Sequence, residues 1–200
     1  MQDQLRKTPS IRVVPDAPTE PKAFLEWSSR QPEGLKYELS RGQVTEMMIW
    51  VTRAHLRICT NVVLELGRVL DRERYLIGSA DFAVQTPFGI RAPDVLVEPM
   101  TAELDQRVSS NPVFLAEVLT PSTLGIDFAE KIPEYTAIPS LQAYLICSQD
   151  LPMVWLLARE RGAWPDKPQP IEGRQAMVPL TGIGIELSMA ALYNGIPDPA

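Results

Sequence analysis

The run from Val113 to Leu119 constrains the fold of this chain most, because it is short and almost continuously apolar. Such a run is typical of a central strand that is buried on both faces of a sheet. Glu117 is its only charged residue. Burying a carboxylate in a strand of this kind costs several kcal/mol unless a metal, a cation or hydrogen-bond donors compensate. The run therefore predicts a sheet-centred fold and makes Glu117 a candidate functional residue.

A second acid lies in a similar apolar setting. Asp94 belongs to the segment Ala92 to Val97, and we expect one strand from Ile90 to Val97 that follows a Pro87-Phe88-Gly89 turn. Two such acids on neighbouring strands repel each other unless a cation lies between them. Mg²⁺ prefers one or two carboxylates together with waters and a substrate phosphate. The sequence therefore predicts a site for Mg²⁺ (or Mn²⁺) held by Asp94 and Glu117.

Lys131 is the third candidate, on a helix that we expect Asp127 to cap together with Glu130. An ammonium group beside the metal can orient the attacking water and neutralise charge on the phosphate. Each candidate also has a structural alternative. Asp94 can bind backbone N–H groups in a turn, Glu117 can pair with Arg91 or Lys131 without a metal, and Lys131 can be an exposed helix residue.

The remaining pattern predicts an α/β fold with a mixed central sheet of about five or more strands flanked by helices. Apolar residues at helical spacing indicate a helix from Thr52 to about Leu70. Other expected elements are a short helix around Phe24 and Trp27, a hairpin from Tyr37 to Val44, strands at Tyr75–Ile77, Phe82–Thr86, Ala143–Cys147 and Met153–Leu157, and a strand or short helix at Ile185–Leu192. We expect residues 1–20 to form a flexible arm and residues 21–200 to form one domain.

Composition limits the function. The net charge of −6 argues against broad non-specific affinity for DNA, although a metal-holding site is itself acidic. The start of the chain lacks the apolar region of a secretory signal, and no apolar stretch approaches the roughly 18 residues needed to cross a bilayer. Cys59 and Cys147 both lie in apolar segments and are typical of buried thiols. We therefore expect a cytoplasmic protein.

At this point several motifs together resemble a known family. Pro93-Asp94 is followed, 23 positions after the acid, by Glu117-Val118-Leu119, which resembles the PD-(D/E)XK nuclease signature. The wider sequence resembles the Uma2 family (DUF820) of restriction-endonuclease-like proteins. The matching stretches, which span about Tyr37 to Asp150, are KYELSRGQV, RAPDVLV, NPVFLAEVLTPST, DFAEKIPEYTAI and LQAYLICSQD.

The resemblance implies a restriction-endonuclease-like core and a metal-dependent endonuclease that hydrolyses DNA phosphodiester bonds. Asp94, Glu117 and the Val118 carbonyl would hold the ion. The signature's lysine position is Leu119 here, so the resemblance implies that Lys131, with Tyr135 one turn further, takes the lysine's role. It also implies a metal or acid role for Glu38.

Some alternatives stay open on the sequence alone. Glu38 can be a polar edge-strand residue. His55 is the only histidine and lies near the apolar face of its helix, so we assign it no ligand role although the resemblance places it near the pocket. The chain can be a catalytically inactive scaffold that binds nucleic acid or protein, or a hydrolase of another phosphoester. A homodimer is a further expectation, because cutting both strands of a duplex needs two sites.

Overall fold

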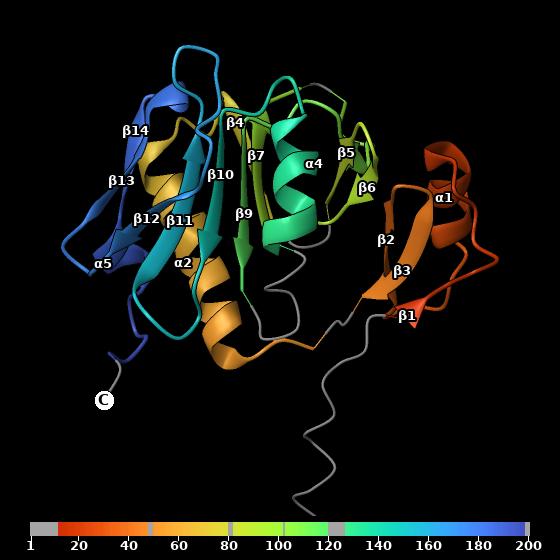
Figure 1. Cartoon of the computed structure of the whole chain (residues 1–200), viewed down its shortest axis with the longest axis horizontal. Coiled ribbons are helices and arrows are strands. Elements are labelled where there is room, and N and C mark those ends of the chain that lie inside the picture. The colour runs from red at the N-terminus through yellow and green to blue at the C-terminus, as the bar shows by residue number, and fades with distance from the viewer. Residues whose placement is uncertain (1–11, 48–49, 80–81, 102, 120–126, 199–200) are drawn as a thin grey trace, which may run out of the picture.

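Two six-stranded sheets form most of the molecule (Figure 1). The structure, a computed structural model, describes residues 12–47, 50–79, 82–101, 103–119 and 127–198. In the central sheet the strand order is β12 (Gln169–Glu172), β11 (Met153–Ala158), β10 (Ala143–Cys147), β9 (Phe114–Val118), β7 (Val95–Pro99) and β4 (Tyr75–Ser79). In the N-terminal sheet it is β1 (Arg12–Val13), β3 (Gln43–Met47), β2 (Lys36–Ser40), β6 (Gly89–Arg91), β5 (Ala83–Thr86) and β8 (Val108–Ser109).

Strand β9 lies inside the central sheet, as its apolar run predicts. It pairs antiparallel with β7 and parallel with β10, and all its residues are buried. The parallel pair needs a crossover, and the connection carries a π-helical turn, η1 (Asp127–Lys131), and helix α4 (Ile132–Thr136). The predicted mixed α/β sheet with flanking helices is confirmed.

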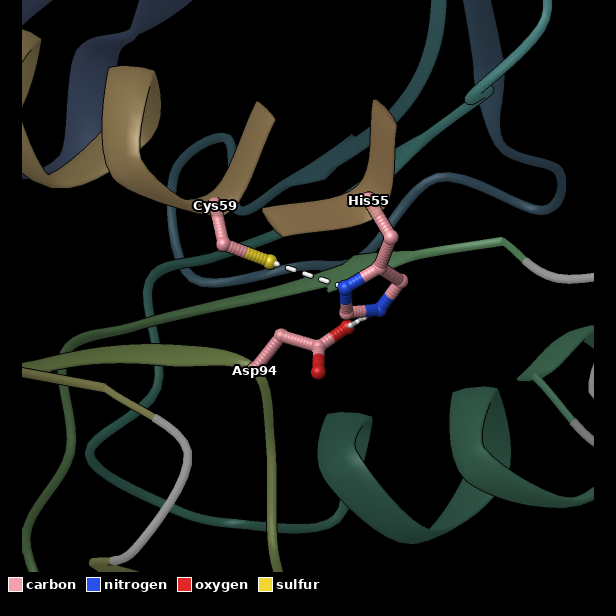
Figure 2. A group of neighbouring side chains, drawn as sticks. All are labelled: His55, Cys59 and Asp94. Atoms are coloured by element: carbon pink, nitrogen blue, oxygen red, sulfur yellow. Dashed lines mark hydrogen bonds and ion pairs between the residues drawn. The ribbon is translucent and has the colours of Figure 1, made fainter. Parts of the chain in front are cut away.

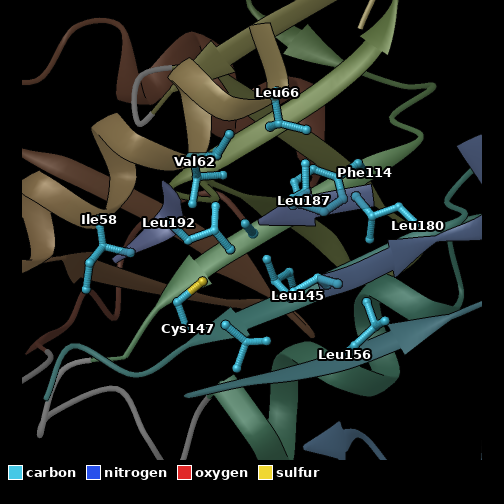
Figure 3. Packing of buried hydrophobic residues seen from close by; sticks show 14 of the residues in the cluster. Ile58, Val62, Leu66, Phe114, Leu145, Cys147, Leu156, Leu180, Leu187 and Leu192 are labelled. Atoms are coloured by element: carbon cyan, nitrogen blue, oxygen red, sulfur yellow. The ribbon is translucent and has the colours of Figure 1, made fainter. Parts of the chain in front are cut away.

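Helix α2 (Arg53–Val69) covers one face of the central sheet, and α4 covers the other (Figure 1). Thr52 caps α2, since its hydroxyl accepts the backbone N–H of His55 at 3.1 Å. The helix buries Ile58, Val62 and Leu66 against the sheet (Figure 3). The hairpin of β13 (Met177–Leu180) and β14 (Ile185–Ser188) and helix α5 (Met189–Leu192) complete this core. The predicted helix from Thr52 to about Leu70 is confirmed.

The expected strand from Ile90 to Val97 is wrong in one respect, because the chain forms two strands there. β6 ends at Arg91 in the N-terminal sheet, and β7 begins at Val95 in the central sheet. Between them lies Pro93, which has no N–H to donate to a strand ladder. The chain therefore changes sheets at this point, and Asp94 occupies the break instead of the middle of a strand.

The N-terminal sheet carries α1 (Pro21–Ser28) and includes part of the predicted arm. Arg12 and Val13 pair with Glu46 and Thr45 of β3, and residues 1–11 lie outside the described part of the chain. The backbones of β6 and β2 approach each other so closely at one position that it requires glycine. At Gly89 (φ +154°) an added Cβ would lie 2.0 Å from the carbonyl oxygen of Leu39, so only glycine fits beside β2.

The segment Ile185–Leu192, expected to be a strand or a short helix, lies at the C-terminal end of the fold. The C-terminal segment forms both predicted elements, because β14 is followed directly by α5. A single turn of 3₁₀ helix, η2 (Thr181–Ile183), precedes β14. The side chain of Asp127, the expected helix cap, lies outside the described part of the structure.

No helix among the described residues combines the length and apolar character that a membrane span requires.

Candidate active site

Asp94 lies at the break between the two sheets, close to the end of β9. Asp94 directly precedes Val95, which the β7–β9 register pairs with Ala116, the residue before Glu117. Asp94 Oδ2 accepts two hydrogen bonds, one from the Val118 backbone N–H at 2.8 Å and one from His55 Nε2 at 3.1 Å. Its carboxylate therefore touches both the acid-bearing strand and helix α2.

The environment of Asp94 keeps its carboxyl group charged. Burial alone raises the pKa of this carboxyl, but the net shift is downward. The hydrogen bond and charge of His55 lower the pKa most, followed by the Val118 N–H and the positive charge of Lys131. Asp94 is therefore an anion at neutral pH, as a metal ligand has to be.

Glu117 faces the opposite helix layer, where it receives two donors. Lys131 Nζ lies 2.7 Å from Glu117 Oε1, and the Tyr135 hydroxyl donates to the same oxygen at 2.9 Å. All three side chains are buried. Burial, and then the negative charge of Glu117, raise the pKa of Tyr135 well above its usual value, so the phenol stays protonated and donates.

Leu119 of the Glu117-Val118-Leu119 motif is a core residue. Leu119 is 5% exposed and packs in the core cluster that contains Tyr135 and Leu115. The strand position that bears lysine in the PD-(D/E)XK signature thus contributes packing here. Lys131 reaches Glu117 from η1 instead, one turn before Tyr135 on α4.

Glu38 contacts the segment that precedes Asp94 and is part of a buried ionic network. Its Oε2 pairs with Arg91 Nη1 at 2.9 Å, and its Oε1 accepts the Ala92 backbone N–H at 3.0 Å. Arg91 also forms a bidentate pair with Glu134 of α4, at 2.7 and 2.9 Å. Burial tends to raise the pKa of Glu38, but the charges of Lys131 and Arg91 and the Ala92 N–H lower it overall. Glu38 thus holds the segment that leads into Asp94.

The grouping of His55 and Cys59 with Asp94 was not predicted from the sequence. His55 and Cys59 extend from α2 toward Asp94 (Figure 2), and one ligand atom of each lies within 4.8 Å of the others. Cys59 Sγ lies 3.5 Å from His55 Nδ1, whereas Asp94 contacts Nε2. A signal for this pair does exist in the sequence, because residues four apart on a helix share a face. That the face meets Asp94 depends on tertiary packing.

The structure therefore brings four of the predicted residues into one region. Lys131 forms an ion pair with Glu117, and its positive charge lowers the pKa of both Asp94 and Glu38. Both Asp94 and Glu117 contribute to raising the pKa of the Cys59 thiol, although burial contributes more. At Val118 the group that contacts Asp94 is the amide N–H, while the predicted role of its carbonyl stays a prediction.

Comparisons with known proteins agree with this fold. The family model of Uma2, described as "Putative restriction endonuclease", matches residues 21–190. A protein of Synechocystis sp., slr1290, is 28% identical over 194 residues, which cover 93% of this chain and 98% of that protein. A second Synechocystis protein, sll1609, is 42% identical over 60 residues, so the match covers 28% of this chain and about a third of that protein's length, 34%.

A solved structure is also similar. A crystal structure described as "a putative nuclease belonging to DUF820", from Anabaena variabilis ATCC 29413, matches with a TM-score of 0.65. The match covers 86% of this chain and 97% of the other, at 13% sequence identity. At that identity the similarity concerns the fold, and it agrees with the restriction-endonuclease-like core implied by the sequence motifs.

Proposed function

The chain belongs to the Uma2 family, and from that premise we propose that it is a metal-dependent endonuclease that hydrolyses DNA phosphodiester bonds. One observation carries the proposal. Two acids lie on neighbouring strands of the central sheet, the partly buried Asp94 directly before β7 and the buried Glu117 in β9, and the ammonium group of Lys131 pairs with Glu117 while its charge acts on Asp94. A pair of carboxylates is the donor set that Mg²⁺ or Mn²⁺ prefers.

The donor chemistry distinguishes this pair from the neighbouring His55–Cys59–Asp94 group. That group offers nitrogen, sulfur and oxygen, a set suited to Zn²⁺ or Co²⁺ more than to Mg²⁺. The donor chemistry therefore supports Asp94 and Glu117 as the residues that would hold a magnesium ion.

Each residue has a defined part in the proposed hydrolysis. A bound Mg²⁺ supplies Lewis-acid activation of the phosphodiester and of a water molecule. Lys131 adds a positive charge that stabilises the negative charge developing on the phosphate oxygens. Tyr135 keeps its proton and, together with Lys131, fixes the Glu117 carboxylate through Oε1. Glu38 and Arg91 hold the backbone that presents Asp94.

One observation favours a second candidate, an inactive scaffold with the nuclease fold. Lys131 and Tyr135 already compensate the buried charge of Glu117 without an ion. This ion pair is one of the structural alternatives that the sequence leaves open. A scaffold would show no thermal stabilisation by millimolar Mn²⁺, whereas a working site would, because a ligand that binds only the folded state stabilises it.

The proposal is tested by cleavage of supercoiled, linear and single-stranded DNA with Mn²⁺, with nucleotide phosphoesters assayed beside them. We expect DNA cleavage by the wild type and a loss of about 100-fold or more in Lys131→Ala, in line with removing one preorganised charge. Lys167→Ala is the matched control, since Lys167 is exposed. Equal cleavage by Lys131→Ala and wild type would contradict the assignment. The homodimer and the cytoplasmic location stay predictions.

A further inference from the structure

We propose that His55 is a positioning residue that turns the Asp94 carboxylate so that Oδ1 faces the divalent cation, an inference that rests on the proposed function. It goes beyond that function because it assigns a role to a residue outside the Asp94–Glu117–Lys131 set. It also specifies which oxygen of Asp94 binds the ion.

The two oxygens of Asp94 differ in their hydrogen bonds. Oδ2 accepts both the Val118 N–H at 2.8 Å and the His55 Nε2 contact at 3.1 Å. Among the residues that the structure describes, no hydrogen bond reaches Oδ1. Two donors from different elements, β9 and α2, fix the carboxylate plane as well as one oxygen, which leaves Oδ1 as the ligating atom. Donors behind a metal ligand commonly hold it in this way.

The contacts of the His55 ring with Asp94 and with the Cys59 thiol indicate which ring nitrogen carries the proton. Burial, followed by the negative charge of Asp94, raises the pKa of this thiol, so it stays protonated and is an S–H donor. Its Sγ lies 3.5 Å from Nδ1, and on the other side of the ring Nε2 lies 3.1 Å from the charged Asp94 carboxylate, which only accepts. In the neutral imidazole Nε2 then carries the hydrogen and donates it to Asp94. The chain of donors runs from Cys59 through His55 to Asp94 (Figure 2).

The imidazole is held firmly enough to orient a ligand. His55 is 6% exposed and lies in the first turn of α2. The hydroxyl of Thr52 accepts its backbone N–H at 3.1 Å and donates to Gln149 Oε1 at 2.6 Å. The backbone of His55 is thus tied through Thr52 to the residues that follow β10, and the ring is buried between helix and sheet.

Manganese binding to the intact protein without DNA tests the inference. The unbound Mn²⁺ is measured by electron paramagnetic resonance. His55→Leu removes the donor, and we expect its dissociation constant for Mn²⁺ to rise about 10- to 100-fold, the usual effect of losing a residue behind a metal ligand. His55→Gln places an amide N–H near the position of Nε2, so its affinity should stay within a few-fold of the wild type. Thr60→Ala, an exposed change on the same helix, is the control.

A second readout does not involve metal. Because His55 is the only histidine, the ¹⁵N spectrum of the imidazole reports this residue alone. For the neutral ring we expect the Nε2–H tautomer in the wild type and a loss of that preference in Asp94→Ala, which removes the acceptor next to Nε2. An Nδ1–H tautomer in the wild type would overturn the inference, since Nε2 could not donate.

The outcomes separate this inference from the proposed function. If the wild type and His55→Leu bind Mn²⁺ equally well, the metal site stands and the role of His55 is wrong. If His55→Gln is as weak as His55→Leu while both melt like the wild type, the donor is not what matters and the inference fails. If Co²⁺ gives a thiolate-to-metal absorption that Cys59→Ala removes, His55 belongs to a metal-ligand set and is not a positioning residue. If the wild type binds no Mn²⁺, both proposals fall.

Discussion

At the scale of single residues, the site depends on acids that stay charged despite burial. Asp94 and Glu38 are both buried deeply enough for burial alone to raise the pKa of the carboxyl, yet in each the net shift is downward. The compensating groups are His55 and Val118 for Asp94, and Lys131 and Arg91 for Glu38. Each acid has its own donors, so the fold can bring the charges close together without protonating them.

The lowered pKa of Glu38 predicts how stability depends on pH. Its folded pKa lies below the value of 4.5 expected for an unfolded chain, so the folded state binds fewer protons between these two values. The stability that charged Glu38 provides is therefore fully present above pH 4.5 and is lost as the pH falls through the folded pKa. Urea unfolding of wild type and Glu38→Gln should show a difference that shrinks on acidification. A difference that grows toward low pH would be inconsistent with this account.

At the scale of elements, helix α2 supplies both core packing and two polar side chains that face Asp94. Ile58, Val62 and Leu66 bury against the central sheet, while His55 and Cys59 continue that face to Asp94. The helical spacing of apolar residues predicts that Ile58, Val62 and Leu66 are buried, since this prediction needs only the local sequence. It cannot predict that His55 and Cys59 face Asp94, because the neighbour of His55 is decided by how the helix packs on β7 and β9.

Two leucines on α2 provide a matched test of its packing. Leu66 is 0% exposed and Leu64 is 66% exposed on the same helix. Leu66→Ala should lower the free energy of unfolding by about 2–5 kcal/mol, because it leaves a cavity in the core. Leu64→Ala should change it by no more than about 0.5 kcal/mol. Equal losses in the two variants, measured by chemical denaturation, would mean that α2 does not pack as described.

At the scale of the whole molecule, the Arg91 network joins the two sheets. Arg91 and Glu38 belong to the N-terminal sheet, whereas Glu134 lies on α4 over the central sheet. Ser40 of β2 adds a hydrogen bond to Glu134 at 2.5 Å. The Ala92-Pro93-Asp94 segment crosses between the sheets at this place, so the network also fixes the approach to the proposed metal site.

Removing Arg91 should therefore cost far more than removing an exposed arginine. Arg91→Ala leaves Glu38 and Glu134 buried without their main partner, and we expect a loss of about 3–5 kcal/mol in unfolding free energy. Arg12→Ala is the control, because Arg12 is 74% exposed in its contact with Glu46 and such pairs contribute about 0–1 kcal/mol. The comparison uses thermal and urea unfolding. Similar losses for the two variants would show that the network does not join the sheets.

The sequence alone predicts the parts of this molecule that depend on local pattern. The apolar run around Glu117 indicates a central strand, and the period of α2 indicates a helix. The roles of Lys131 and Glu38 are implied by the resemblance to Uma2, and they stay predictions. The split at Pro93 is harder to predict, since apolar residues flank it on both sides and only the missing N–H marks the change of sheet. The Arg91–Glu134 pair joins residues 43 positions apart, and no local pattern links them.

Anomalous diffraction from a crystal containing Mn²⁺ tests the central claim most directly, because it locates the ion relative to named atoms. The account predicts one strong peak at bonding distance from both Asp94 Oδ1 and the Glu117 carboxylate, and no such peak in Asp94→Asn crystals prepared in the same way. A peak bonded to only one of these acids, a peak held by His55 and Cys59 instead, or no peak at saturating Mn²⁺ would contradict it.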